Sequence, residues 1–472
     1  MLDRMAKIAS TSSPRFALIG LSLGYFMVLF DTTALTVALP DVTRDLHSGV
    51  VGLAWITDAY TLTFAAFLLA AGVIADRQGS GRTFLSGLMG FGALSLLCAA
   101  APSTGTLVAL RALLGVSGSL VLPPSLALIA GLYTDPARRP RAVAAWASIS
   151  GVALAAGPLL GGVLVAWLGW RGIFFVNAPV AALSWLLLRG RMPVIARRAR
   201  RIDARGQVAI LVAVTALTWA LIRGGAQGWT APDVLAAFAL TVVAGLLVVL
   251  AERRSPVPAV PGSLLKVPVV SGALIGGFVA GGAFAGELFL TTLQLQQARG
   301  FGVILTGAAF LPLTAPMVLN PPLAGRLIAR TGPALPVFGG LLLVTAGSGV
   351  LAAVRNNAPY AWVAVGLVLL GLGMSFTLPA LTSAVVLAAP AEAAGAASGL
   401  FSVLRQTGAT VGVAAMAAVI GAHVADAQHG HILIAVAALA AAVTWRMIAR
   451  PQTTGHPVEA GPRHPTATTR SQ

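Results

Sequence analysis

Five charged residues stand inside long apolar stretches of the sequence. Three are acids, Asp31, Asp58 and Glu287, and two are bases, Arg111 and Arg405. A charge inside a lipid bilayer costs roughly 2.5–3.5 kcal/mol on insertion scales, so such residues need a functional explanation. Burial favours the protonated form of a carboxyl group, and a nearby arginine favours the ionised form. A carboxylate in such a setting can exchange protons and can also attract a cation, so the two would compete for it.

The two arginines and the first acid are assigned different roles. Asp31 is predicted to couple proton movement to the work of the protein, with Arg111 adjusting its protonation. The alternatives are a structural hydrogen bond from Asp31 within a broken helix, and an Arg111 side chain that reaches toward the membrane surface. For Arg405, hydrogen bonds to backbone carbonyls are favoured over contact with a substrate.

The remaining acids and three aromatic residues form the predicted substrate site. Asp58 and Glu287 are predicted to attract a cationic substrate, on which Tyr25, Trp55 and Tyr60 would stack. The alternatives are hydration of Asp58 near a helix end and an internal structural pair for Glu287. For any single aromatic residue, packing at the membrane interface is the alternative.

The composition assigns the chain to a class of protein. Of 472 residues, 57% are hydrophobic and only 10% are charged, whereas soluble domains carry about 25% charged residues. This excludes a soluble enzyme, a disordered chain and a disulfide-bonded scaffold. The single cysteine, Cys98, has no partner for an intramolecular disulfide.

Apolar stretches long enough to cross a membrane predict an all-α integral membrane protein. Fourteen spans are expected, and an even number places both termini on one side. Their ranges are 16–39, 51–75, 83–101, 107–131, 142–168, 172–189, 207–223, 234–251, 269–293, 303–323, 335–354, 361–388, 397–421 and 431–447.

The basic residues predict the orientation. With a cytoplasmic N-terminus, the inner segments hold 24 of the 31 Lys and Arg residues, the outer segments hold 5, and Arg111 and Arg405 lie within spans. This asymmetry follows the positive-inside rule and predicts that both termini are cytoplasmic. The net charge of +17 is therefore attributed to topology rather than nucleic-acid binding. The arginine-rich stretch 189–205 is read as a topology anchor, with binding of anionic lipids as the alternative.

A short internal repeat predicts two six-helix halves around a central cavity. The segment Gly72–Gly79 and the segment Gly325–Gly332 share glycines and an arginine at the same spacing. The expected organisation is a cytoplasmic tail (1–15), a first bundle (16–189), a basic loop (190–206), two inserted helices (207–251), a linker (252–268), a second bundle (269–450) and a disordered tail (451–472).

Enzyme and metal chemistry are not expected. The sequence has no zinc-protease, nucleophile-elbow or phosphate-loop motif. All six histidines are expected in loops or tails, and the pair His429 and His431 is too sparse for a metal site. No catalytic residue, metal or cofactor is predicted, and a proton gradient would supply the energy.

Several motifs in order resemble one family. The stretches Asp31–Pro40, Trp55–Tyr60, Gly72–Arg82, Arg111–Gly115, Gly157–Gly162, Trp170–Pro179 and Ser398–Gly408 resemble motifs of the major facilitator superfamily. Together with the two extra spans, the chain resembles the fourteen-span drug:proton antiporters over nearly all of residues 16–450.

The resemblance implies alternating access, in which two halves rock around a central site. It assigns a gating role to two groups of residues. The first is the loop after the second span, with Gly72, Asp76, Arg77, Gly79 and Arg82; the second is the fifth-span motif, with Gly157, Pro158, Gly161 and Gly162. A plain topology-fixing loop and ordinary helix packing are the respective alternatives.

The sequence departs from the family pattern at four positions. Ser80 and Gly81 stand where basic residues are usual, which leaves fewer charges for the gating contact. Leu114 replaces a common glutamine and so removes a polar relay. Ala329 stands at the position of the second half that matches Asp76, so the charge relay there is incomplete.

The predicted function is proton-coupled export of small lipophilic, cationic drugs or antibiotics. Two alternatives on the same fold are a dedicated exporter of one antibiotic or metabolite and a proton-coupled permease. A sensor is disfavoured because no sizeable soluble domain is present. The expected partners are the substrate, protons and membrane lipids, without nucleic acid, and the protein is expected to act as a monomer.

Overall fold

The computed structural model describes residues 14–135, 138–193, 195, 204–254, 262–355, 357–389, 394–420 and 427–449. Regular structure in these residues is entirely helical, as the composition predicted. Most of the arginine-rich stretch, the second tail and nearly all of the first tail lie outside the described residues.

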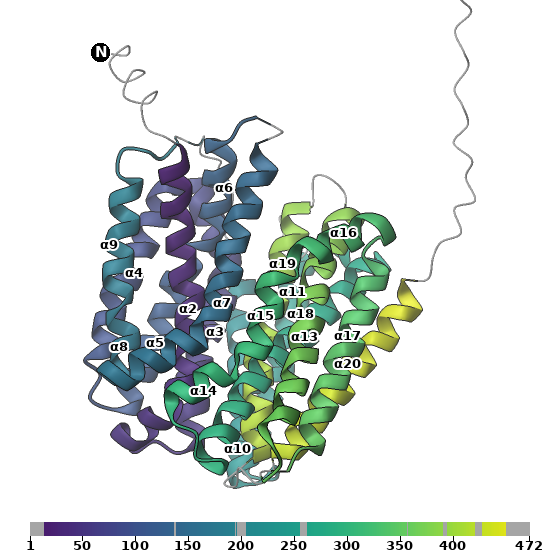
Figure 1. The fold of residues 1–472 in the computed structure, drawn as a ribbon. Helices are drawn as coiled ribbons and strands as arrows, with labels where there is room; N and C mark the ends of the chain where they lie inside the picture. Colours follow the sequence, from purple (N-terminus) through teal and green to yellow (C-terminus); the bar gives the residue numbers. More distant parts are fainter. Residues whose placement is uncertain are drawn as a thin grey trace, which may run out of the picture.

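The first half of the chain forms one group of helices (Figure 1). They are α2 (Pro14–Leu46), α3 (Val50–Gln78), α4 (Ser80–Ala99), α5 (Thr104–Ser119), α6 (Leu122–Leu132), α7 (Arg139–Leu168), α8 (Arg171–Phe175) and α9 (Asn177–Leu188). The 33-residue helix α2 extends about 50 Å at ~1.5 Å per residue, which exceeds the bilayer core of about 30 Å. We call its two ends the Pro14 end and the Leu46 end of the molecule.

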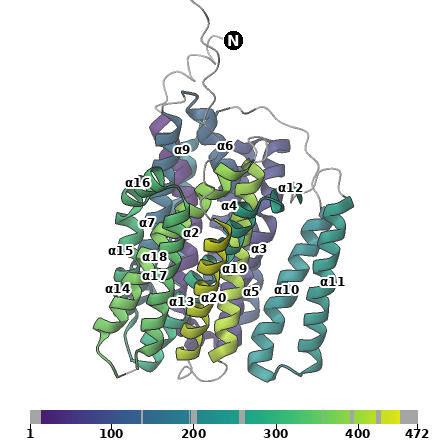
Figure 2. The same cartoon turned by 90° about the vertical axis from the view of Figure 1, so that its right-hand side faces the viewer.

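Two helices follow as a hairpin, α10 (Ala204–Gln227) and α11 (Pro232–Arg254). Figure 2 shows this hairpin at one side of the molecule. Helix α10 packs against α3 of the first half and α19 of the second, with Gly225 directly against Ala418. Only 11% of the most apolar stretch of α11 is buried within the protein. This helix therefore presents its leucine and valine side chains to lipid.

The second half forms the other group. Its elements are α12 (Gly262–Leu265), α13 (Pro268–Leu293), the π-helix η1 (Gln294–Ala298), α14 (Val303–Ala309), α15 (Leu311–Leu319), α16 (Pro321–Thr331), α17 (Ala334–Ala353), α18 (Tyr360–Ala388), α19 (Ala394–Ile420) and α20 (Ala427–Ile448). Glycines along α13 allow α19 to approach closely, because a Cβ at Gly281 or Gly282 would meet backbone carbonyls of α19.

Among the described residues, twelve helices are long and apolar enough to cross a membrane, so the predicted count of fourteen is not confirmed. The two missing spans are 142–168 and 303–323. Helix α7 is 30 residues long, but the described apolar stretch within it is Ala156–Leu168. The other span is divided among α14, α15 and α16, because prolines stand in the first turns of α15 and α16 and inside α15.

The internal repeat has the same geometry in both halves. Gly79 ends α3 with φ +103°, and Gly332 ends α16 with φ +72°. Each backbone N–H closes the last helical turn, to Ala75 at 3.0 Å and to Ile328 at 2.9 Å. These positive φ values favour glycine, which explains why the last residue of both repeat segments is glycine.

Buried apolar side chains form two main clusters that reveal where the halves join. The larger cluster runs through the first half and continues into the second half toward the Leu46 end. The other cluster belongs to the second half alone and lies toward the Pro14 end, with members such as Leu274, Phe401 and Trp445. The two halves therefore share a core at the Leu46 end and have separate cores at the Pro14 end.

Candidate functional site

A buried ion pair lies within the first half. The guanidinium of Arg111 on α5 is paired with the carboxylate of Asp31 on α2, and neither side chain is more than 1% exposed. Arg111 Nε also donates a hydrogen bond to the carbonyl of Ile56 at 3.1 Å. One side chain thus links α2, α3 and α5, because the planar guanidinium can bind two acceptors at once.

An amide completes the coordination of the same carboxylate. Asn177, the first residue of α9, donates from Nδ2 to Asp31 Oδ1 at 3.1 Å. The same nitrogen lies 3.1 Å from the hydroxyl of Ser95 on α4. Asn177 lies within the stretch Trp170–Pro179, and no role was predicted for it, although an amide beside an apolar stretch is a signal for a buried hydrogen bond. We call Asp31, Arg111, Asn177 and Ser95 the first-half network.

Tyr60 packs against the Arg111 side chain of the first-half network. Its ring centroid lies 4.4 Å from the guanidinium carbon of Arg111, which is a cation–π contact. Its hydroxyl donates to the carbonyl of Val28 at 3.0 Å, and only 1% of the residue is exposed. The structure therefore places Tyr60 within the protein interior, against a protein cation, in this conformation.

Asp58 on α3 lies apart from this network. The residue is fully buried, and neither carboxylate oxygen has a hydrogen-bond partner among the described residues. One turn further along α3, the hydroxyl of Thr61 accepts a hydrogen bond from Thr410 of α19 at 3.0 Å. A buried carboxyl group without a hydrogen-bond partner is costly, because burial removes water without supplying another donor.

The other two predicted aromatic residues contact partners on different helices. Tyr25 stacks on Trp146 of α7, with ring centroids 4.7 Å apart and planes at 11°. Trp55 is half-buried and lies 5.9 Å from the ring of Trp219 on α10. The predicted stacking residues Tyr25, Trp55 and Tyr60 therefore lie in three separate contacts rather than one aromatic cage.

A second buried pair of ionisable side chains lies in the other half, and it corrects a prediction. His431 was expected in a loop, but it lies in α20, is 0% exposed and places Nδ1 2.7 Å from Glu287 Oε2. Its Nε2 is 3.4 Å from Gln294 Oε1. The expectation was wrong because His431 was placed at a span boundary, whereas α20 begins four residues earlier. We call Glu287, His431 and Gln294 the second-half network.

The contact between Glu287 and His431 leads to a prediction about the stability of the protein. His431→Leu is expected to lower stability by about 3 kcal/mol, because it leaves Glu287 buried without its partner. The double variant E287L/H431L is expected to recover most of that loss. Thermal unfolding of the purified proteins, followed by intrinsic tryptophan fluorescence, measures both. Equal melting temperatures for H431L and the wild type would contradict the pairing.

The predicted gating loop joins α3 to α4 near the Pro14 end. Gly72 and Asp76 are half-buried on the last turns of α3, while Arg77 and Arg82 are exposed on either side of Gly79. This arrangement leaves both arginines available for contacts with other segments. Their role as a latch stays a prediction.

The fifth-span motif packs α7 against both halves. A Cβ at Gly157 would collide with the hydroxyl of Thr33, and one at Gly161 would lie 2.8 Å from the carbonyl oxygen of Ala34, both on α2. On the other side, a Cβ at Gly162 would lie 2.6 Å from the carbonyl oxygen of Val303 at the start of α14. The motif therefore provides a close contact within the first half and another between the halves.

Further contacts between the halves lie at the same end. The carbonyl of Pro158, inside α7, packs against Gly307 of α14. Gln296 of η1 donates from Nε2 to the carbonyl of Val37 on α2 at 2.8 Å. Together with the shared core, these contacts close the molecule toward the Leu46 end.

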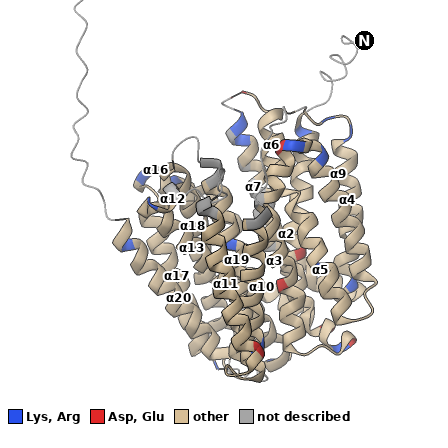
Figure 3. Ribbon diagram, turned by 180° about the vertical axis from the view of Figure 1, so that it is seen from behind, with Lys and Arg blue, Asp and Glu red and all other residues tan. Residues whose placement is uncertain are grey.

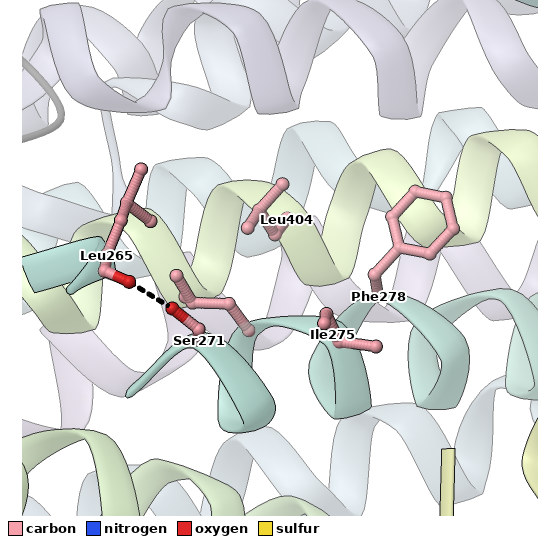
Figure 4. Close-up of a pocket in the computed structure, with 6 residues that line it drawn as sticks. Leu265, Ser271, Ile275, Phe278 and Leu404 are labelled. Atoms are coloured by element: carbon pink, nitrogen blue, oxygen red, sulfur yellow. Dashed lines mark hydrogen bonds between the residues drawn. The ribbon is translucent and has the colours of Figure 1, made fainter. Parts of the chain in front are cut away.

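An apolar pocket lies at the start of α13. It has a volume of about 430 Å³ and is lined by Leu265, Ser271, Leu274, Ile275, Phe278 and Leu404. Figure 4 shows these side chains, with the hydroxyl of Ser271 donating to the carbonyl of Leu265 at 2.6 Å. The lining holds no charged group, so it can accept a lipophilic group but offers no charge selectivity.

Charged side chains are unevenly distributed along the helices. Figure 3 shows many Lys and Arg residues at the end that carries the N-terminus, and a few coloured segments midway along the bundles. Within the described residues, no group of three or more His, Cys, Asp or Glu side chains is arranged to hold a metal. Membrane-length helices around paired interior charges define a membrane transporter.

Comparison with known protein families agrees with this class of protein. Residues 21–413 match the Major Facilitator Superfamily. The chain belongs to this superfamily, and it is a multi-pass membrane transporter rather than an enzyme.

Relatives and solved structures support the family and the fold. "Multidrug resistance protein Stp" of Mycobacterium tuberculosis is 36% identical over 420 residues, which cover 89% of this chain and 78% of the relative. "Methylenomycin A resistance protein" of Streptomyces coelicolor is 34% identical over 439 residues, covering 92% of each. A crystal structure of a POT family transporter in complex with 5-aminolevulinic acid has a TM-score of 0.67 at 16% identity, covering 92% of this chain and 96% of that one. The last likeness concerns the fold alone.

Proposed function

We propose that this protein exports small lipophilic drug or antibiotic molecules from the bacterial cytoplasm in exchange for protons. Relatives of similar length carry the names of drug and antibiotic resistance proteins, which supports export of such compounds. The observation that carries the proton coupling is the ion pair between Asp31 and Arg111, fully enclosed within the first half.

Protonation of this pair would act on three helices at once. A proton on Asp31 removes the charge that holds the Arg111 guanidinium in place. That guanidinium also binds α3 through the carbonyl of Ile56, so its release would loosen α2, α3 and α5 relative to one another. Loss of the proton would restore the pair. The exchange of one proton would thereby bias the conformation of the first half.

Alternating access requires the contacts at the Leu46 end to open. The present conformation joins the halves there, through α7 and α14 and through Gln296, while their cores are separate at the Pro14 end. We propose that the Pro14 end faces the cytoplasm, consistent with the predicted orientation. The conformation would then be the one that loads substrate from inside the cell.

We also propose that the chain crosses the membrane fourteen times. Helix α7 and the broken segment formed by α14 and α15 would supply the two crossings beyond the twelve long apolar helices. Proline breaks are tolerated in a membrane where neighbouring helices cover the freed backbone groups. Helix α14 meets this condition because it packs against α7. The two six-helix halves would flank the α10–α11 hairpin, with both termini cytoplasmic.

The predicted preference for cationic substrates rests on Asp58 and Glu287. In this conformation both oxygens of Asp58 are enclosed, Glu287 Oε2 contacts His431, and Glu287 Oε1 is enclosed. A cation would reach these oxygens only after the helices rearrange. Both residues therefore stay candidates for a later step of the cycle.

Export and coupling are tested in inside-out membrane vesicles. The vesicles are energised to acidify their interior, and a pH-sensitive dye follows proton release when cationic, neutral or acidic compounds are added. At least one compound is expected to release protons from wild-type vesicles, and Asp31→Asn is expected to reduce this signal to background. The matched control is Asp233→Asn, which removes a carboxylate paired with Arg223 on the exposed surface of the hairpin.

The outcomes separate the alternatives. Proton release by Asp31→Asn at the wild-type rate would refute the role of this residue. A response to one compound only would identify a dedicated exporter. Absence of any response would favour the permease, which is then tested by uptake into right-side-out vesicles.

A further inference from the structure

Among the described interior residues, Arg405 is a cation without a partner. Six ionisable side chains, tyrosine and cysteine aside, lie well inside the described bundles: Asp31, Asp58, Arg111, Glu287, His431 and Arg405. Asp31 is paired with Arg111, Glu287 is paired with His431, and Asp58 is enclosed. Arg405 alone among them is partly accessible to solvent and has no hydrogen bond or ion pair from its guanidinium to any described residue. The hydrogen bonds to backbone carbonyls that the sequence favoured for Arg405 are therefore not made to any described residue.

The packing of α19 against α13 fixes the position of Arg405. The carbonyl oxygen of Arg405 faces Gly281, and Gly408 lies against the carbonyl of Phe278. The Cγ of Arg405 would lie only 3.2 Å from a Cβ at Gly281, so the stem of the side chain is held along α13. One glycine-rich contact therefore holds both the backbone of Arg405 and the first part of its side chain within the α13–α19 interface.

The surroundings of this guanidinium include the other half of the molecule. The first half contributes Tyr25 of α2, which lies within electrostatic range of Arg405. The hydroxyl of Tyr25 makes no hydrogen bond to a described residue, and its ring stacks on Trp146 of α7. A cation from the second half and an aromatic stack from the first half therefore lie near each other, level with the part of the molecule where the two cores are separate.

We propose that Arg405 is an anion-binding subsite of the transport site, so that this conformation selects small lipophilic molecules with a carboxylate or another single negative charge. A guanidinium in a poorly solvated place is stabilised by a carboxylate that accepts two hydrogen bonds in parallel. Tyr25 and Trp146 offer an apolar surface for the body of such a molecule. The inference rests on the proposed export function and names its substrate class.

The test is equilibrium binding to the purified full-length protein in phosphatidylcholine nanodiscs, without any gradient. Three tritiated probes share one ring system: 2-naphthylacetate, its uncharged amide, and (2-naphthylmethyl)trimethylammonium. The wild type is expected to bind the acid at least about tenfold more tightly than the amide, as one charge-assisted hydrogen-bond pair provides. Arg405→Gln is expected to abolish that preference, and Arg405→Lys to keep part of it. Arg446→Gln, which removes an exposed arginine near the end of α20, is the matched control.

Three results would overturn the proposal. They are tighter binding of the cation than of the acid by the wild type, an unchanged preference for the acid in Arg405→Gln, and no binding of the acid at millimolar concentration. The wild-type comparison and Arg405→Lys decide the matter even where Arg405→Gln fails to fold. Because no proton gradient is used, failure of antiport leaves this result intact, and failure here leaves the vesicle assay intact.

Discussion

Arg111→Gln is expected to reduce the stability of the protein by about 3–5 kcal/mol, because it leaves Asp31 buried and without its cation. The substitution also removes the hydrogen bond to Ile56 and the cation above the ring of Tyr60. Arg111→Lys is expected to cost less, since it keeps the charge but loses the planar group that binds two acceptors. The melting temperature and the fraction of monodisperse protein measure both variants.

A double-mutant cycle separates the ion pair from the other contacts of Arg111. The variant D31N/R111Q contains no unpaired buried charge, so it is expected to be more stable than R111Q alone. Arg223→Gln serves as the matched control, because its partially exposed pair with Asp233 is worth at most about 1 kcal/mol. If R111Q and R223Q melted at the same temperature, the network around Asp31 would make no special contribution to the stability of the protein.

Gly162→Ala is expected to shift the protein away from the conformation described here and to abolish export. The new methyl group would lie 2.6 Å from the carbonyl oxygen of Val303, so α7 and α14 would have to separate. Overpacking of this kind costs roughly 1–3 kcal/mol, which changes the ratio of two conformations by about 5- to 150-fold. The Leu46 end would then open in a larger fraction of molecules.

Spin labels can follow this opening. Arg44→Cys and Gln297→Cys place labels on exposed positions of α2 and η1, with the buried Cys98 replaced by alanine. The distance between the labels is expected to increase in Gly162→Ala. Gly339→Ala is the matched control, since a Cβ at this helical glycine meets nothing within 4 Å. An unchanged distance distribution together with normal export would show that the α7–α14 contact does not govern access.

Much of the architecture was determined by the sequence alone. The apolar stretches and the few charged residues between them specify a helical membrane protein, because water-free surroundings require every backbone group to be bonded within its own helix. The two repeat segments also end alike in the structure, since Gly79 and Gly332 adopt positive φ values at equivalent helix ends. The count of fourteen is not confirmed, because prolines divide 303–323 into short helices whose crossing is not evident from helix length.

The partners of the interior charges were decided only by the tertiary structure. The sequence associated Arg111 with Asp31 across 80 residues, but it did not determine that Asn177 binds the same carboxylate or that His431 faces Glu287. Such pairs join helices far apart in the chain, and a single sequence records residue types but not which faces of those helices meet. Whether a buried charge is paired, enclosed or open to solvent depends on that packing. For this reason the sequence predicted a cation site at Asp58 and Glu287, whereas the structure leaves Arg405 as the open charge in the described interior.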